Sequence, residues 1–107
     1  MLLLEIKFCQ VGEDLKIVDP TPEQISQAVD QCCFGHDDVI VCLSRSDYDW
    51  VESDGQTWIN FRQGGSGIFV YGGPLDYTTT LGVFLSYSRN EETWKGHFLW
   101  SWMDRGL

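Results

Sequence analysis

Residues 21–43, TPEQISQAVDQCCFGHDDVIVCL, decide the fold because they specify a helix followed by a buried strand. Thr21 can cap the helix, Pro22 suits its first position, and Gln24 stands three residues after the threonine, which is the spacing of a capping box. A glycine follows the last helical residue, so we expect the helix over 22–34. The apolar face of this helix carries Ile25, Ala28, Val29, Cys32 and Cys33.

Apolar patterns on both sides of the helix predict strands. Residues 39–43 (VIVCL) form an unbroken run rich in β-branched side chains, which is typical of a central strand. Residues 2–9 alternate between apolar and charged side chains, and a shorter second strand is expected at 15–18. Within residues 2–9 the apolar face carries Leu4, Ile6 and Phe8, and the opposite face carries Glu5 and Lys7.

The middle of the chain predicts a meander of three strands. Two β-rich segments, 48–52 and 57–62, flank residues 53–56, whose Asp-Gly pair is a strong hairpin signal. A second glycine-bearing turn at 64–67 leads to the apolar segment 68–71. These strands are expected to follow the central strand in order.

The last third of the chain returns to a helical period. Asp76 can cap a helix that runs to about Arg89, and its shared face is expected to carry Tyr77, Leu81, Phe84, Leu85 and Ser88. The aromatic tail, residues 94–102, fits a short turn of helix followed by a docked extended segment. The expected fold is α+β, with a mostly antiparallel sheet of about five strands packed with two helices, in one domain spanning 1–107.

The composition limits which classes of partner and which cellular compartment are expected. The chain has 107 residues, is 43% hydrophobic and carries a net charge of −9. Nucleic acid and anionic membranes would be repelled by this charge, so neither is an expected partner. The start, MLLLEIKF, is too short for a signal-peptide core, and we expect a cytoplasmic protein. The four cysteines are expected to be reduced, with at least three of them buried.

A search for catalytic motifs yields little. His36 beside Asp37 and Asp38 fits a solvated loop better than a catalytic pair, and His97 is expected to be a packed histidine. The histidines and cysteines match no zinc spacing, so we expect no metal and no cofactor. The glycine-rich segment 64–67 lacks the residues of a phosphate loop. We therefore expect that the chain is not an enzyme.

One hairpin combines acidic and aromatic side chains. In its first strand, Trp50 and Glu52 share one face while Asp49 and Val51 share the other. The rings are either core residues or anchors displayed for a basic partner, with the carboxylates steering the approach. The candidate partner-binding residues are Asp47, Tyr48, Asp49, Trp50, Glu52, Asp54 and Trp58.

The order of these segments resembles the small immunity proteins of bacterial polymorphic toxin systems, in the family associated with deaminase-type toxins. The resemblance rests on the Asp19-Pro20-Thr21 helix entry, the aromatic hairpin, Phe84-Leu85-x-Tyr87 and the ending Trp94-x-x-x-Phe98-x-Trp100. It implies a cytoplasmic inhibitor that binds and neutralises a cognate toxin domain acting on nucleic acid. Such a domain would present basic surface, which an acidic inhibitor could occupy.

Two other functions also fit the sequence. The chain could be a regulatory or scaffold domain without a toxin target, or a small enzyme that uses His36 or Cys42. The oligomeric state, the identity of the toxin and the face that binds it are not specified by the sequence.

Overall fold

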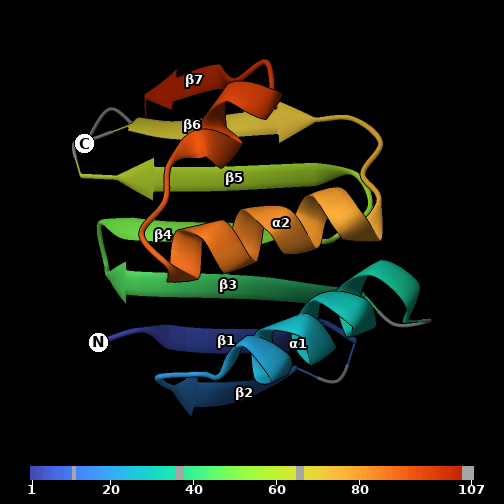
Figure 1. Cartoon of the computed structure of the whole chain (residues 1–107). Coiled ribbons are helices and arrows are strands. Elements are labelled where there is room, and N and C mark those ends of the chain that lie inside the picture. Colours follow the sequence, from blue (N-terminus) through green and yellow to red (C-terminus); the bar gives the residue numbers. More distant parts are fainter. Residues whose placement is uncertain (11, 36–37, 65–66, 105–107) are drawn as a thin grey trace.

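A seven-stranded antiparallel sheet forms one layer of the protein (Figure 1). The structure is a computed structural model, which describes residues 1–10, 12–35, 38–64 and 67–104. Six strands make up most of the sheet: β1 (Leu3–Phe8), β2 (Glu13–Val18), β3 (Val39–Ser46), β4 (Asp49–Ser53), β5 (Trp58–Gln63) and β6 (Gly67–Gly72). The short β7 (Ser101–Asp104) extends it beyond β6, so the order is β2-β1-β3-β4-β5-β6-β7.

The α+β class with two helices and an antiparallel sheet is confirmed, and the sheet has more strands than the expected five. β4, β5 and β6 form the predicted meander after the central β3. β2 begins at Glu13, two residues before its predicted start, and β3 continues to Ser46. The extended part of the aromatic tail is the additional strand β7, which pairs with β6.

Two helices, α1 (Pro22–Phe34) and α2 (Tyr77–Ser88), lie on one face of the sheet (Figure 1). The predicted capping box is present at the start of α1. The Thr21 backbone N–H donates to Gln24 Oε1 at 2.9 Å, and the Gln24 N–H donates to Thr21 Oγ1 at 3.2 Å. At α2 the Asp76 carboxylate accepts from the Thr79 N–H at 2.7 Å, as predicted for a cap.

The core lies between the helices and this face of the sheet. The sheet contributes Leu4, Ile6, Val41, Leu43, Val51, Ile59 and Phe61, all buried. The buried residues of α1 are Ile25, Ala28, Val29 and Cys32, as predicted except for the half-buried Cys33. Burial of side chains this size contributes roughly 1.5–3 kcal/mol each.

The prediction for the buried face of α2 is only partly right, because Phe84 is the one predicted residue that is fully buried. The fully buried residues of α2 are Thr80, Val83, Phe84 and Tyr87. Tyr77, Leu81 and Leu85 are only partly buried at the flank of the core, and the ring of Tyr77 lies 5.4 Å from that of Phe34 in α1. The sequence pattern follows the large apolar side chains, whereas the buried face also contains Thr80, whose hydroxyl keeps it out of an apolar pattern.

The tail packs as an aromatic cluster over β5 and β6. Residues Thr93–His97 form a short 3-10 helix, η1, whose Trp94 is buried. The Trp94 and Trp100 rings both meet Phe61 edge-on, with centroids 5.0 and 4.7 Å away. The Trp100 Nε1–H donates to the Lys95 carbonyl at 2.7 Å, so the half-buried indole keeps a polar partner. This cluster fixes the chain that leads into β7.

The cysteine prediction is only partly right. All four thiols are unpaired, but only Cys32 and Cys42 are buried, Cys33 is half-buried and Cys9 is exposed. Cys9 directly follows the last residue of β1, at the start of the turn that leads toward β2. Within the part of the chain that the structure describes, no helix is long and apolar enough to cross a membrane.

Candidate interaction surface

The second face of the sheet has no helix over it among the described residues, and we call it the open face (Figure 1). The strand registers define which side chains are neighbours on it. Glu5 of β1 stands opposite Cys42 of β3, which in turn stands opposite Glu52 of β4. In the next row Ser44 stands opposite Trp50. Three strands from different parts of the chain thus bring two carboxylates and an indole together.

These side chains line a shallow depression of about 320 Å³, which we call the acidic depression. Besides two serines, its lining residues are Glu5, Lys7, Cys42, Asp47, Trp50 and Glu52. Three carboxylates against one ammonium leave a local charge of about −2 at neutral pH. Strands β1, β3 and β4 fix the backbone positions of most of these residues.

The Cys42 thiol reports the electrostatic character of the acidic depression. Burial raises its pKa, and the carboxylates of Glu52 and Glu5 raise it further, to about 12, against the opposing effect of Lys7. A thiolate would be a third negative charge between two carboxylates, so the thiol stays protonated at neutral pH. Cys42 is therefore a poor nucleophile, which counts against the interpretation as an enzyme using this cysteine.

Two of the predicted partner-binding carboxylates make hydrogen bonds within the fold. The Asp49 carboxylate accepts from the Tyr87 hydroxyl at 2.6 Å, which ties β4 to the end of α2. Asp54 accepts from the backbone N–H groups of Gln56, Thr57 and Trp58 at 2.9, 2.8 and 3.1 Å. These bonds build the β4–β5 turn. Asp49 and Asp54 are therefore structural residues, although part of each remains exposed.

The remaining predicted residues divide between separate places. Asp47, Trp50 and Glu52 lie in the acidic depression. Tyr48 is 60% exposed in the β3–β4 turn, where the Arg62 guanidinium lies 4.7 Å from its ring centroid. Trp58, half-buried at the start of β5, lines a different hollow of about 280 Å³, near Cys9 and Asp38.

Sequence reasoning missed the contribution of β1 and β3 to this surface. Glu5, Lys7 and Cys42 belong to the depression as much as Trp50 does. The alternation of residues 2–9 had already placed Glu5 and Lys7 on the face away from the core. Only the strand order, which is non-local, puts Glu5 in one row with Glu52, with Cys42 between them.

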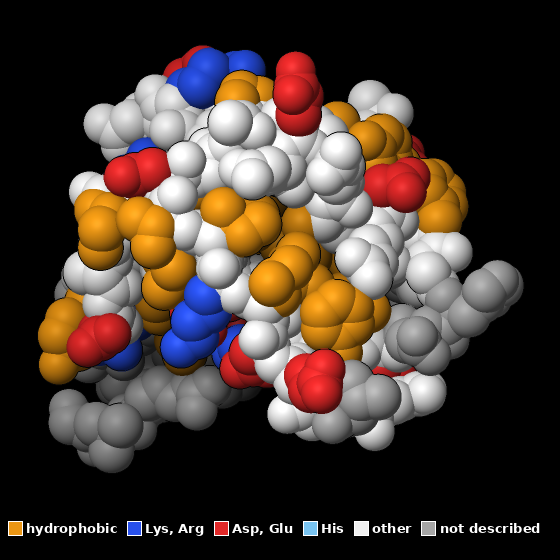
Figure 2. Space-filling model, turned by 90° about the horizontal axis from the view of Figure 1, so that it is seen from below, with side chains coloured by type: hydrophobic (Ala, Val, Ile, Leu, Met, Phe, Trp, Pro, Cys, Tyr) orange, Lys and Arg blue, Asp and Glu red, His pale blue; other side chains and the backbone are white. Residues whose placement is uncertain are grey.

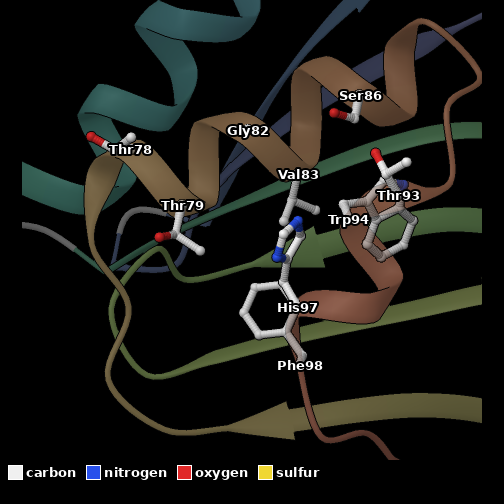
Figure 3. A pocket seen from close by; sticks show the side chains of 9 residues that line it. All are labelled: Thr78, Thr79, Gly82, Val83, Ser86, Thr93, Trp94, His97 and Phe98. Carbon is white, nitrogen blue, oxygen red and sulfur yellow. The ribbon is translucent and has the colours of Figure 1, made fainter.

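A third hollow lies on the helix side, between α2 and η1 (Figure 3). This groove has a volume of about 440 Å³. The aromatic side chains of η1 and the following residue form one wall, and α2 forms the other with the hydroxyls of Thr78, Thr79 and Ser86. His97, predicted to be packed, is instead exposed and turned toward this groove (Figure 3), because η1 ends there.

The groove shows no arrangement for catalysis. Its one titratable group among the described residues is His97, and no carboxylate or thiol lines it. Across the described ranges, no three His, Cys, Asp or Glu side chains gather so as to hold a metal ion. His36 and Asp37, the other candidate pair, lie outside the described residues, and Asp38 is exposed.

Comparison with known proteins gives no relative. No family model matches the chain, and neither a curated protein nor a solved structure matches it.

Proposed function

We propose that this chain is an immunity protein, which binds a basic toxin domain through the open face of its sheet and neutralises it in the cytoplasm of the producing cell. The acidic depression carries this proposal. It combines Glu5, Asp47 and Glu52 with the indole of Trp50 on a sheet face that no helix of the described residues covers.

This combination suits an arginine or lysine side chain of a partner. A guanidinium can bond to a carboxylate through two N–H groups and stack on an indole at the same time. The partly buried position of Trp50 lowers the local dielectric constant, so charge pairs formed here are stronger than at a fully exposed rim. The surrounding net charge of −9 speeds the approach of a basic protein.

A toxin domain that acts on nucleic acid fits these requirements, because it must present cationic side chains to phosphates. An inhibitor that places carboxylates on those side chains competes directly with the substrate. The resemblance of the segment order to immunity proteins supplies this class of partner, and the acidic depression supplies a place to bind it.

The test uses the toxin domain encoded beside the gene for this chain. Its binding kinetics are measured with the wild-type chain and with Glu5→Gln/Glu52→Gln, which removes two charges from the acidic depression. The matched control is Glu23→Gln/Asp30→Asn, which removes two charges from exposed positions of α1, on the other side of the sheet.

We expect the open-face variant to associate about tenfold more slowly at low salt, with the control close to wild type. The difference should shrink as the Debye length falls from about 10 Å at 0.1 M to about 3 Å at 1 M. Absence of binding by the wild-type chain would refute the immunity function. Equal effects of the two variants would move the interface away from the open face.

A further inference from the structure

The β2 edge of the sheet exposes apolar side chains next to charged ones. β2 is the last strand at this end, and no other strand among the described residues pairs with its outer side. Leu15 is 49% exposed and Val18 is 58% exposed, and the N-terminal Met1 is more exposed still. Figure 2, seen from the side that β2 lines in Figure 1, shows hydrophobic side chains between acidic and basic ones.

The edge is regular enough to accept another strand. β2 keeps one continuous register with β1 over six residue pairs, and its sequence, EDLKIV, contains no proline. The Asp19 N–H donates to the Leu2 carbonyl at 2.7 Å, so by alternation Leu15 and Ile17 direct their backbone groups toward β1. The backbone groups of Asp14 and Lys16 therefore point outward, where a new strand would pair.

We propose that two copies of this chain pair antiparallel through β2, about a twofold axis at Leu15. In this register Asp14 of each copy stands opposite Lys16 of the other, and the two Leu15 side chains meet on the helix side. Both charged residues offer outward backbone groups, so they form the hydrogen-bonded pairs of the new ladder. The half-exposed leucines lose their contact with water.

Charge complementarity selects this register over its neighbours. An axis at Lys16 or at Asp14 would place identical charges opposite each other, which is destabilising. An axis at Ile17 would set Lys16 opposite Val18 and leave Asp14 without a charged partner. Only the axis at Leu15 gives two opposite-charge pairs.

The charges within each copy continue the same pattern. Lys16 already stands opposite Glu5 of β1, and Asp14 stands opposite Lys7. Across the proposed pairing of the two β2 strands, one row on the open face would contain Glu5, Lys16, and then Asp14 and Lys7 of the second copy. The charges in this row would alternate in sign. Lys16 and Asp14 would then each have an opposite charge on both sides, which favours this pairing over a like-charged edge.

The inference goes beyond the proposed function and does not depend on it. A twofold axis between antiparallel strands runs perpendicular to the sheet, so both open faces would lie on the same side of one continuous sheet. The acidic depressions would remain accessible. A dimer would thus present two of them to its partners.

The first experiment measures molar mass by light scattering and sedimentation over a range of concentrations. A salt concentration of 0.15 M limits the repulsion between two chains of charge −9, because the Debye length is then about 8 Å. We expect a concentration-dependent dimer that Leu15→Glu weakens at least tenfold. The matched control is Leu99→Glu, at a leucine that is 92% exposed and follows η1 near the opposite edge.

The second experiment tests whether a new disulfide forms between the two copies. In a Cys9→Ser background, Leu15→Cys should form a disulfide-linked dimer under mild oxidation, because side chains opposite each other at a non-hydrogen-bonded position lie about 4.5–5.5 Å apart at Cβ. Val18→Cys, also exposed, should not, because the axis sets the two copies of this residue far apart. A monomer at all concentrations would overturn the proposal. A dimer that Leu15→Glu leaves intact, or equal crosslinking of both cysteine variants, would also overturn it.

Discussion

The substitution Gly55→Ala tests how the β4–β5 turn packs against α1. Gly55 has φ +74°, in the left-handed region that favours glycine. A Cβ atom there would lie 2.6 Å from Cys32 Sγ, 2.9 Å from Cys33 Sγ and 3.0 Å from the carbonyl carbon of Cys32. The backbone conformation costs about 1 kcal/mol for alanine. Displacing a buried thiol and the helix end adds about 1–3 kcal/mol, so we expect a total loss of about 2–4 kcal/mol.

Gly64→Ala is the matched control for this prediction. Gly64 has a similar φ of +65°, but no described atom would lie within 4 Å of its Cβ. It should therefore lose only the backbone contribution, about 1 kcal/mol. The free energy of unfolding is measured by urea titration followed by tryptophan fluorescence. If Gly55→Ala is no more destabilising than Gly64→Ala, the expected steric conflict between a side chain at residue 55 and the end of α1 does not exist.

Two further predictions concern single titratable groups. Partial burial raises the pKa of the Asp54 carboxyl, but the hydrogen bonds from Thr57, Gln56 and Trp58 outweigh it and hold this pKa below its ordinary value. The stabilisation by these hydrogen bonds is thus present above about pH 4 and lost as the pH falls through the lowered pKa. Asp54→Asn should therefore lower the free energy of unfolding by about 1 kcal/mol at pH 7 and by progressively less in acid, measured by urea unfolding. A pH-independent difference would contradict this. For Cys42, the raised pKa predicts alkylation by iodoacetamide at pH 7 more slowly in the native protein than in urea, measured by mass spectrometry, and Glu5→Gln/Glu52→Gln should speed the native reaction.

The local parts of the fold were predictable because short-range chemistry specifies them. The capping box at Thr21 and the cap at Asp76 need only residues three positions away, and both are present as predicted. The meander likewise follows from the turn residues between its strands. The buried face of α2 was only partly predictable because the helix packs against α1, η1 and the sheet at once, and the pattern of apolar residues does not encode those contacts.

The candidate surface was predictable only in part, for the same reason. The sequence placed Trp50 and Glu52 on one face of a strand, and that face is the open one. It could not show that Asp49 bonds to Tyr87, because the two residues are 38 positions apart. Nor could it bring Glu5 next to Cys42, since this contact depends on the pairing of β1 with β3.

We propose that the acidic depression is the surface that holds the partner. The most direct measurement is an NMR map of backbone amide and indole shifts on adding the neighbouring toxin domain to the labelled chain. We expect the largest changes on Glu5, Asp47, Trp50 and Glu52, with Glu23 and Asp30 of α1 unchanged. Changes concentrated instead in the groove between α2 and η1, around Ser86 and His97, would contradict it.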